Sequence, residues 1–226
     1  MTKINMEFIV DEKVTDLGLK IKAVVINNIE NITTTEDYKN WHSQKVSELL
    51  EKYRDYNLKD DEIIEGFYTL HQKVGVPRRK NLPASENLIK LLIKRNGLIN
   101  INKAVDIYNI ISMESKLCLG AHDIDKIPGN VTLRLTDGTE TFYPLSRTEL
   151  KKVDSGQYSF IDDDNDIICW LDIKQVDKTK VTEDSTNILY LIIGNEQTPD
   201  KYLEDTALKI IDLTTKYCGG NGRIIR

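Results

Sequence analysis

The sequence is poor in cysteine, with only Cys118, Cys169 and Cys218 among 226 residues. Three scattered cysteines are too few for a disulfide framework, and no two of them form the CxxC pair that is typical of zinc or redox sites. The acidic turn Asp162–Asp166 lacks the glycine and the closing glutamate of a calcium-binding loop. We therefore expect three buried thiols in a reducing compartment, no bound cofactor and no metal site.

Long apolar runs are also missing from the chain. The longest, around Ile188 to Ile193, is far too short to cross a bilayer. The segment from Met1 to Phe8 lacks the apolar region of a signal peptide. These features predict a cytoplasmic protein that has no membrane partner.

A general excess of positive charge is absent, since the formal net charge is −5. A protein that coats nucleic acid neutralises many phosphates with lysine and arginine, so this balance argues against such a protein and against a DNA partner. Contact with only the end of an RNA is compatible with it, because such contact needs a local basic patch rather than a global excess.

Hydrophobic periodicity predicts a largely helical first half and a β-rich second half. The predicted strands are 5–10, 19–28, 131–135, 141–145, 158–161, 167–171 and 187–193, and the predicted helices are 36–54, 60–74, one opened by Pro83, 101–115 and 201–217. Asp137-Gly138 between two short apolar runs is a hairpin signature. No repeat or linker interrupts the chain. We therefore expect one α+β domain over residues 1–226, with helices packed against a mostly antiparallel central sheet.

Three ordered blocks carry a resemblance to a known family. They are residues 101–109 (INKAVDIYN), residues 120–129 (GAHDIDKIPG) and residues 175–187 (QVDKTKVTEDSTN). In order and spacing they resemble the editing domain of the phenylalanyl-tRNA synthetase β subunit, over residues 75–193. Residues 1–74 match no part of that family, and we expect their strands and helices to pack on the 75–193 segment. The class II catalytic motifs of a synthetase are absent, so the resemblance implies a free-standing form of the domain.

The resemblance implies a pocket that holds the amino acid carried on the terminal adenosine of a tRNA. It places Asn109 in this pocket, beside Tyr108 where the family has a small hydroxyl residue. The pocket histidine of the family falls at Gly120, but His122 stands two positions further on, and such positions face the same side of an extended segment. His122 is therefore the candidate catalytic base, with Asp123 beside it as a candidate substrate contact. The alternatives are that His122 only lines the pocket or has a structural role.

Five residues form the densest polar cluster of the matching region: Asp172, Lys174, Gln175, Asp177 and Thr179. An amino-acid ligand has an ammonium end, which suits a carboxylate such as Asp172, and a carbonyl end, which suits Lys174 or Gln175. All five are candidate substrate contacts, and the alternative is a solvated loop. We expect Asn109, His122 and Asp172 to border one cavity.

The other two histidines, His42 and His71, lie on predicted helices outside the three blocks. Nothing in their surroundings along the chain points to chemistry. We expect both at the surface.

Residues 77–95 form a basic stretch within the acidic chain. It contains Arg78, Arg79, Lys80, Lys90, Lys94 and Arg95 against the single acid Glu86. Such a patch is the best candidate for phosphate contacts with the acceptor end of a tRNA or an aminoacyl-tRNA. A solvated helix face is the alternative.

These observations favour a free-standing, tRNA-associated protein that hydrolyses mischarged aminoacyl-tRNA in trans. The alternative is a non-catalytic binding module for RNA, an amino acid or a nucleotide, and the missing histidine at position 120 favours it. A third hypothesis is an enzyme for a small molecule on a reused fold, since a fold does not determine a function. A deep pocket with the basic stretch at its rim would favour the hydrolase of mischarged aminoacyl-tRNA.

The expected lack of a metal site gives the first testable prediction. Removal of divalent ions with a chelator is expected to leave the melting temperature unchanged. A metal that binds only the native state would stabilise it by linkage, so a fall of several degrees that added metal reverses would contradict this prediction.

Overall fold

Two β-sheets form the framework of the protein in the computed structural model, which describes residues 6–32 and 34–226. Within these ranges, nine strands form a five-stranded sheet of order β1-β4-β5-β6-β7 and a four-stranded sheet of order β3-β8-β2-β9. The predicted start of the first strand at residue 5 lies outside the described residues. The strands are β1 (Phe8–Val10), β2 (Lys20–Asn27), β3 (Cys118–Asp123), β4 (Val131–Leu135), β5 (Tyr158–Asp162), β6 (Ile167–Trp170), β7 (Lys174–Gln175), β8 (Asn187–Gly194) and β9 (Asn221–Ile224).

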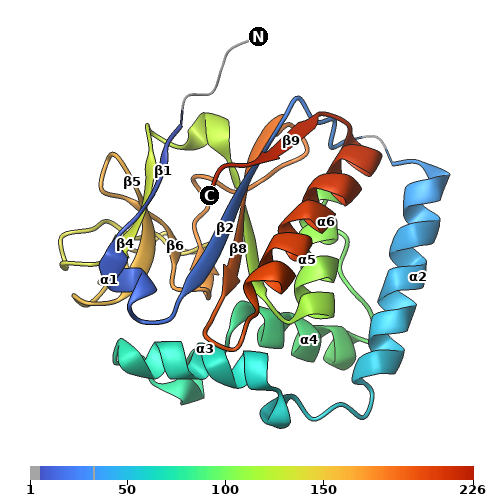
Figure 1. Ribbon diagram of the computed structural model, residues 1–226. Helices are drawn as coiled ribbons and strands as arrows, with labels where there is room; N and C mark the ends of the chain where they lie inside the picture. The colour runs from blue at the N-terminus through green and yellow to red at the C-terminus, as the bar shows by residue number, and fades with distance from the viewer. Residues whose placement is uncertain (1–5, 33) are drawn as a thin grey trace.

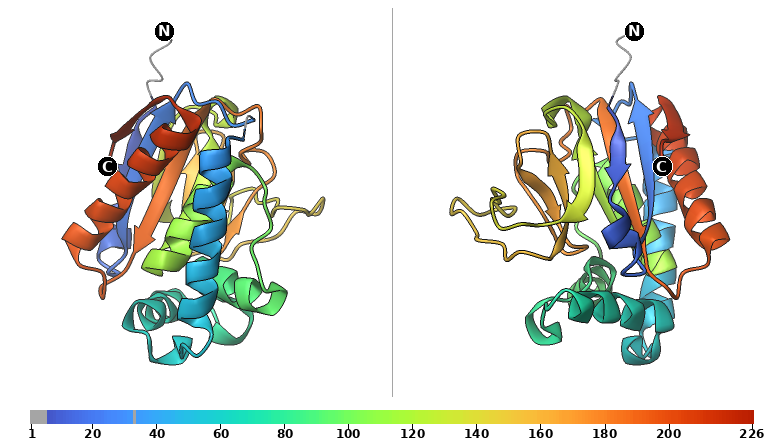
Figure 2. Two further views of the ribbon diagram at one scale, coloured as in Figure 1. Left: turned by 90° about the vertical axis from the view of Figure 1, so that its right-hand side faces the viewer. Right: turned by 60° about the vertical axis from the view of Figure 1, so that its left-hand side comes forward.

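Helices cover the outer face of the four-stranded sheet and one end of the molecule. Figures 1 and 2 show α5 and α6 on the side of this sheet that faces away from the five-stranded sheet, with α2 outside them and with α3 and α4 across the lower end. The α-helices are α1 (Glu12–Thr15), α2 (Glu36–Tyr53), α3 (Glu62–Lys73), α4 (Ala84–Arg95), α5 (Lys103–Ser115) and α6 (Asp200–Cys218), and the short 3-10 turns are η1 (Leu58–Asp60), η2 (Arg78–Lys80) and η3 (Ile124–Lys126).

Both sheets are mostly antiparallel. Neighbouring strands run antiparallel except for β1, which pairs with β4 in parallel. The prediction of an α+β fold with a mostly antiparallel sheet is therefore confirmed, although two sheets take the place of one.

Strands β3 and β8 and the second half of β2 are buried on both faces of the four-stranded sheet. Successive residues of a strand point to opposite sides, so Ala23 and Val25 face the five-stranded sheet while Val24 and Ile26 face the helices. Along β8 every residue from Ile188 to Gly194 is buried. This explains the apolar runs in β2 and β8, where strict alternation with polar residues would be expected of a sheet with one wet face.

Side chains at the helix ends satisfy backbone groups that the helices leave free. Thr35 accepts a hydrogen bond from the amide of Tyr38 at the start of α2, and Asp61 and Asn102 cap α3 and α5 in the same way. At the end of α4, Asn96 has a φ of 50°, the left-handed conformation common at helix C-termini. These local signals explain why the helix limits agree with those predicted to within a few residues.

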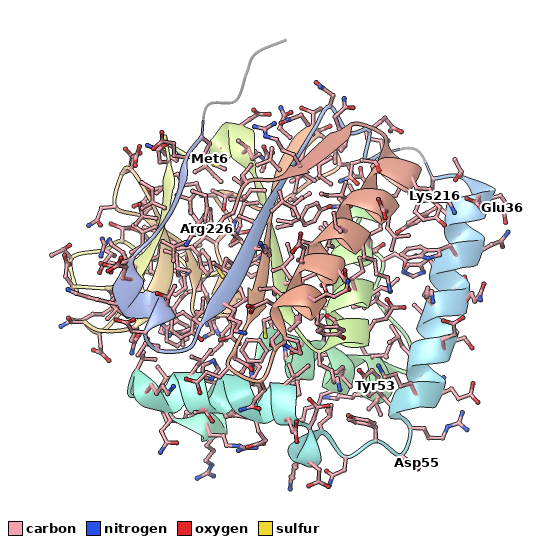
Figure 3. All side chains as sticks on the ribbon, viewed as in Figure 1. Met6, Glu36, Tyr53, Asp55, Lys216 and Arg226 are labelled. Atoms are coloured by element: carbon pink, nitrogen blue, oxygen red, sulfur yellow. The ribbon has the colours of Figure 1, made fainter. Side chains whose placement is uncertain are left out.

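A separate apolar cluster holds the lower helices together. It joins α2, α3, α4 and α5 through residues such as Leu49, Ile64 and Leu92. Tyr53, labelled at the end of α2 in Figure 3, is fully buried there, and its hydroxyl donates a hydrogen bond to the carbonyl of Met113. The cluster places α4 against the sheet edge where the candidate site lies.

The predicted hairpin of residues 131–145 is wrong. Strand β4 pairs with β5, and residues 136–157 between them form a long irregular loop (Figure 2). The carboxylate of Glu140 accepts hydrogen bonds from the amides of Asp137 and Gly138 and pairs with Arg134, so it holds the Asp137-Gly138 turn in a local loop. The turn signal was therefore real, but the predicted strand at 141–145 does not form, and Thr141 and Pro144 make only isolated bridges with Asp166 and Val176.

Among the described residues, no helix combines the length and the apolar character that crossing a bilayer requires.

The single-domain hypothesis remains a prediction, and the position of β2 suggests a test. Because β2 lies between β8 and β9, we expect that a chain starting at residue 31 lacks a cooperative thermal transition. Limited proteolysis of the whole chain is likewise expected to release no stable fragment that begins near residue 30 or 55. A stable fragment from either position would contradict the prediction.

Candidate functional site

A cavity of about 800 Å³ opens where the edge of the four-stranded sheet meets the end of the five-stranded sheet. Its wall comes from α4, α5, β3, β8, the β6–β7 segment and the loop at 144–151. Most of its inner surface is apolar, with Leu82, Leu88, Leu119, Leu191 and Ile193 among the lining residues. A mostly apolar concave site with a few polar groups is the usual form of a small-ligand pocket.

Three uncharged polar side chains of this wall are at least partly buried and have no hydrogen-bond partner within residues 6–32 and 34–226. They are the hydroxyl of Tyr108 and the amides of Asn109 and Gln175, and all three residues line the cavity. Asn109 is only 6% exposed. Burial raises the pKa of Tyr108, so its hydroxyl stays protonated and can donate. Because buried polar groups are normally paired, these groups are available to a ligand or to bound water.

The side chain of Gln175 occupies the space beside Gly120. A Cβ atom added at Gly120 would lie 2.4 Å from the Nε2 atom of Gln175. Position 120 is where the family resemblance implied a histidine, so an amide from β7 now fills space that a side chain from β3 would take. This exchange could not be deduced along the chain, because β3 and β7 belong to different sheets.

The mouth of the cavity is basic. Lys80, Arg147, Lys151 and Lys174 line it, against Glu149. The ammonium of Lys151 lies 3.9 Å from the ring centroid of Trp170, and that of Lys174 lies 6.0 Å from it. An anionic group of a ligand would therefore be attracted to this opening.

The carboxylate of Asp172 does not face the cavity, contrary to the sequence-based expectation. The residue belongs to the wall, but its side chain has no solvent exposure. Its Oδ1 atom lies 2.6 Å from Nε2 of His71 and accepts a hydrogen bond of 2.6 Å from the hydroxyl of Tyr158, while Oδ2 accepts one of 3.2 Å from the thiol of Cys118. A ligand ammonium therefore has no access to it.

Internal donors keep this buried carboxylate ionised. Burial alone would raise the pKa of Asp172, but interaction with His71, together with the donors Tyr158 and Cys118, holds it below the ordinary value. The preceding residue, Leu171, is fully buried with a φ of 52°, a conformation that bulky side chains rarely adopt. The network thus fixes an unfavourable backbone turn directly before the cavity residues Ile173 and Lys174.

His71 was missed by the sequence analysis and its predicted surface position is wrong. It is fully buried, and His42 is only 8% exposed. The helical period does place His71 on the same face as Ile64 and Phe67, which are both buried, so the pattern of α3 contained a usable signal. Its partner Asp172 lies 101 positions away, and no local pattern could identify that contact.

His122 does not line the cavity, so the expected grouping of Asn109, His122 and Asp172 around one opening is wrong. His122 is fully buried, its Nδ1 atom lies 2.8 Å from the hydroxyl of Thr179, and its Nε2 atom has no partner. It lies two residues beyond Gly120 on β3, about 7 Å further along the strand. Burial lowers the pKa of His122 to about 3, so the ring is neutral at physiological pH.

Three further candidates also lie outside the cavity wall. Asp123 accepts a hydrogen bond from Ser185 and pairs with Lys126, and Thr179 is held by His122. Asp177 accepts a hydrogen bond from the amide of Ser146 and pairs with Lys180. Of the predicted substrate contacts, the cavity therefore brings together Tyr108, Asn109, Lys174, Gln175 and the backbone of Asp172.

The basic stretch at 77–95 divides into three kinds of residue. Lys80 lines the cavity. Arg78 stacks on the ring of Tyr68 and pairs with Glu65, and Lys90 pairs with the buried Glu86. The remaining members, Arg79, Lys94 and Arg95, are exposed.

Neither cysteine of the cavity wall is suited to act as a base near neutral pH. Burial, followed by the nearby Asp172, raises the pKa of the Cys118 thiol well above its usual value, and the same causes raise that of Cys169. Within the described part of the chain, no group of three or more histidine, cysteine or acidic side chains is arranged to hold a metal ion. The neutral donors of Tyr108, Asn109 and Gln175 can position a ligand in this cavity.

The fold and the cavity define an α+β protein with a ligand pocket at a sheet edge, and comparison places it in a family. The family profile described as the B3/4 domain matches residues 74–198, more than half of the chain. The chain therefore belongs to the B3/4 domain family, a domain that also occurs in the phenylalanyl-tRNA synthetase β subunit. His71 lies just outside the matched range.

A solved structure has the same fold. The crystal structure of an N-terminal fragment of the phenylalanyl-tRNA synthetase β subunit from Pyrococcus horikoshii superposes with a TM-score of 0.51 at 14% identity. The superposition covers 98% of this chain and 51% of the fragment, so the chain spans about half the fragment's length. A comparison with curated protein sequences finds no match.

The Asp172 network predicts a stability effect. Asp172→Asn is expected to lower the free energy of unfolding at pH 7 by about 3 kcal/mol, because it breaks a buried pair from one side. The folded-state pKa of Asp172 is lowered, so its stabilisation is present above the unfolded-state pKa of about 4 and is lost as the pH falls through the folded value. The difference in the free energy of unfolding between Asp172→Asn and wild type should therefore become smaller at acidic pH.

Denaturant titration at several pH values measures this effect. Asp205→Asn on α6 is the matched control, since Asp205 forms only an exposed pair with Lys201 and should change the free energy by less than about 0.5 kcal/mol. Equal effects of the two substitutions would contradict a special role for the buried carboxylate.

Proposed function

We propose that this protein binds the aminoacylated end of a tRNA in the cavity and hydrolyses mischarged aminoacyl-tRNA in trans. The observation that carries the proposal is the unpaired polar group of Tyr108, Asn109 and Gln175 within an apolar cavity that has a basic mouth. Membership of the B3/4 domain family supports a role associated with tRNA synthetases. The apolar wall suits an amino-acid side chain, and the basic mouth suits the RNA phosphates.

Hydrolysis breaks the ester between the amino acid and the ribose by attack of water on the carbonyl carbon. The amide of Gln175 and the hydroxyl of Tyr108 are donors that can stabilise the negative charge that develops on the carbonyl oxygen. Asn109 can orient the water or the amine of the ligand. Rate acceleration would then come from positioning, with the proton of the water accepted by the substrate or by solvent.

The first measurement is release of amino acid from a panel of mischarged tRNAs. On any substrate that is hydrolysed, Gln175→Ala is expected to lower the single-turnover rate by roughly a hundredfold, the usual effect of losing one such donor. Gln72→Ala on α3 is the matched control, because Gln72 is exposed and lies outside the cavity wall. His122→Asn, once shown to be folded, should keep the rate.

Position 120 provides an independent variant. Gly120→Ala puts a Cβ atom where the Gln175 amide lies, and the flexible glutamine can move aside at little cost in stability. The variant should therefore lose activity much as Gln175→Ala does while melting within a few degrees of wild type. Full activity in both variants would remove Gln175 from the proposed chemistry.

A non-catalytic binding module is the second candidate, and one observation favours it. The cavity wall contains no histidine, since His122 lies elsewhere, and burial raises the pKa values of both of its thiols. If no mischarged tRNA is hydrolysed above the spontaneous rate while an amino acid or a nucleotide binds tightly, the binding module replaces the hydrolase.

A further inference from the structure

Two lysines at the cavity mouth lack an acidic partner. Within the described residues, neither Lys151 nor Lys174 has a carboxylate oxygen within 4.0 Å of its ammonium. Nearby lysines differ: Lys178 pairs with Asp162 and Asp166, and Lys180 pairs with Asp177. Lys80 also lines the cavity and likewise has no such pair within the described residues, so Lys151 and Lys174 are distinguished by their shared position near Trp170.

The indole of Trp170 holds these lysines in place. Trp170 is 4% exposed, its Nε1–H donates a hydrogen bond of 2.7 Å to the side-chain oxygen of Gln157, and Phe142 packs beside it at 6.4 Å between ring centroids. A cation near the face of a tryptophan ring is attracted to it. Trp170 is thus a rigid platform that keeps both ammonium groups near the mouth.

The two ammonium groups also repel each other. Burial, and after it the charge of Lys174, lowers the pKa of Lys151. The charge of Asp154 opposes this shift, but no carboxylate oxygen of the described residues lies within 4.0 Å of either ammonium, so a bound anion would stabilise the two cations. A phosphate suits this position, because its charged oxygens accept hydrogen bonds from ammonium groups.

The loop that carries Lys151 exposes apolar side chains beside this pair. Tyr143 is 48% exposed, Leu145 46% and Leu150 59%, and the last two also line the cavity. Exposed aromatic and aliphatic groups next to cations are typical of surfaces for unpaired nucleotides, whose bases stack on the side chains while lysines contact the backbone. A duplex would offer phosphates to the lysines but no free base to the loop.

We propose that Lys151 and Lys174, held on Trp170, bind a phosphodiester of an unpaired RNA end, whose bases lie on Tyr143 and Leu150. The proposal rests on the proposed function, because the nucleotide that follows this phosphate enters the cavity. It adds a site outside the basic stretch at 77–95. It also makes the free single strand, rather than the helical part of the RNA, the element that is recognised.

The test measures the salt dependence of binding for two probes. One probe is an uncharged tRNA with its unpaired 3′ end, and the other is the same tRNA with that end removed. Lys151→Ala/Lys174→Ala should reduce the slope of log affinity against log salt by about 1.4 for the intact tRNA, since each single-strand phosphate contact contributes about 0.7. When salt rises from about 50 to 200 mM, the variant should therefore lose roughly sevenfold less affinity than wild type does.

Three comparisons make the result specific. Lys13→Ala/Lys59→Ala removes two exposed lysines outside the cavity wall and should leave the slope unchanged. Lys151→Arg/Lys174→Arg keeps both charges and should keep the slope near that of wild type. For the shortened tRNA, wild type and Lys151→Ala/Lys174→Ala should bind alike.

Each contrary outcome is distinct. An unchanged slope in Lys151→Ala/Lys174→Ala would overturn the phosphate site. An equal reduction of the slope for the intact and the shortened tRNA would overturn it as well. Binding of AMP that requires both lysines, without binding of either tRNA, would overturn the RNA assignment in favour of a mononucleotide. The expected slope change without hydrolysis of any mischarged tRNA would support this site and reject the hydrolase.

Discussion

The carboxylate of Asp172 has no contact with solvent, and such a buried charge persists only when donors surround it. His71 comes from α3, Tyr158 from β5 and Cys118 from β3, so one carboxylate joins a helix and both sheets. The contact sets the position of the β6–β7 segment, whose next residues line the cavity. The left-handed Leu171 belongs to the same arrangement, since its amide donates to the carbonyl of Tyr158. The shape of the cavity therefore depends on an interaction that no ligand touches.

The exchange between Gly120 and Gln175 changes the chemistry that the cavity can support. An imidazole offers proton transfer near neutral pH, whereas an amide offers only hydrogen bonds. With Tyr108 and Asn109 beside it, the site presents neutral polar groups inside and cations outside. Such a site suits a ligand with an anionic part at the mouth and a mixed apolar and polar part within. This distribution of charge joins the proposed function to the phosphate site on Trp170.

Local patterns predicted much of the fold but only part of the site. The helices at 36–54, 60–74 and 101–115 were found because capping and periodicity involve residues a few positions apart. The hairpin at 131–145 failed because Glu140 closes its turn locally and β4 pairs with β5 across a long loop. Asp172 was chosen for its charge, and the chain offers no sign that His71, Tyr158 and Cys118 would enclose it.

The sequence by itself predicted the main helices, the apolar strands of the core and the blocks around Tyr108, Asn109, Lys174 and Gln175, although it missed strands β3, β7 and β9. It did so because side-chain periodicity and family patterns are written along the chain. Only the tertiary structure decided that Asp172 and His122 turn inward, that Gln175 fills the space beside Gly120, and that Lys151 meets Lys174 on Trp170. The direction of a side chain depends on strand register and on donors that are distant in sequence, so it is set only when the sheets and helices pack.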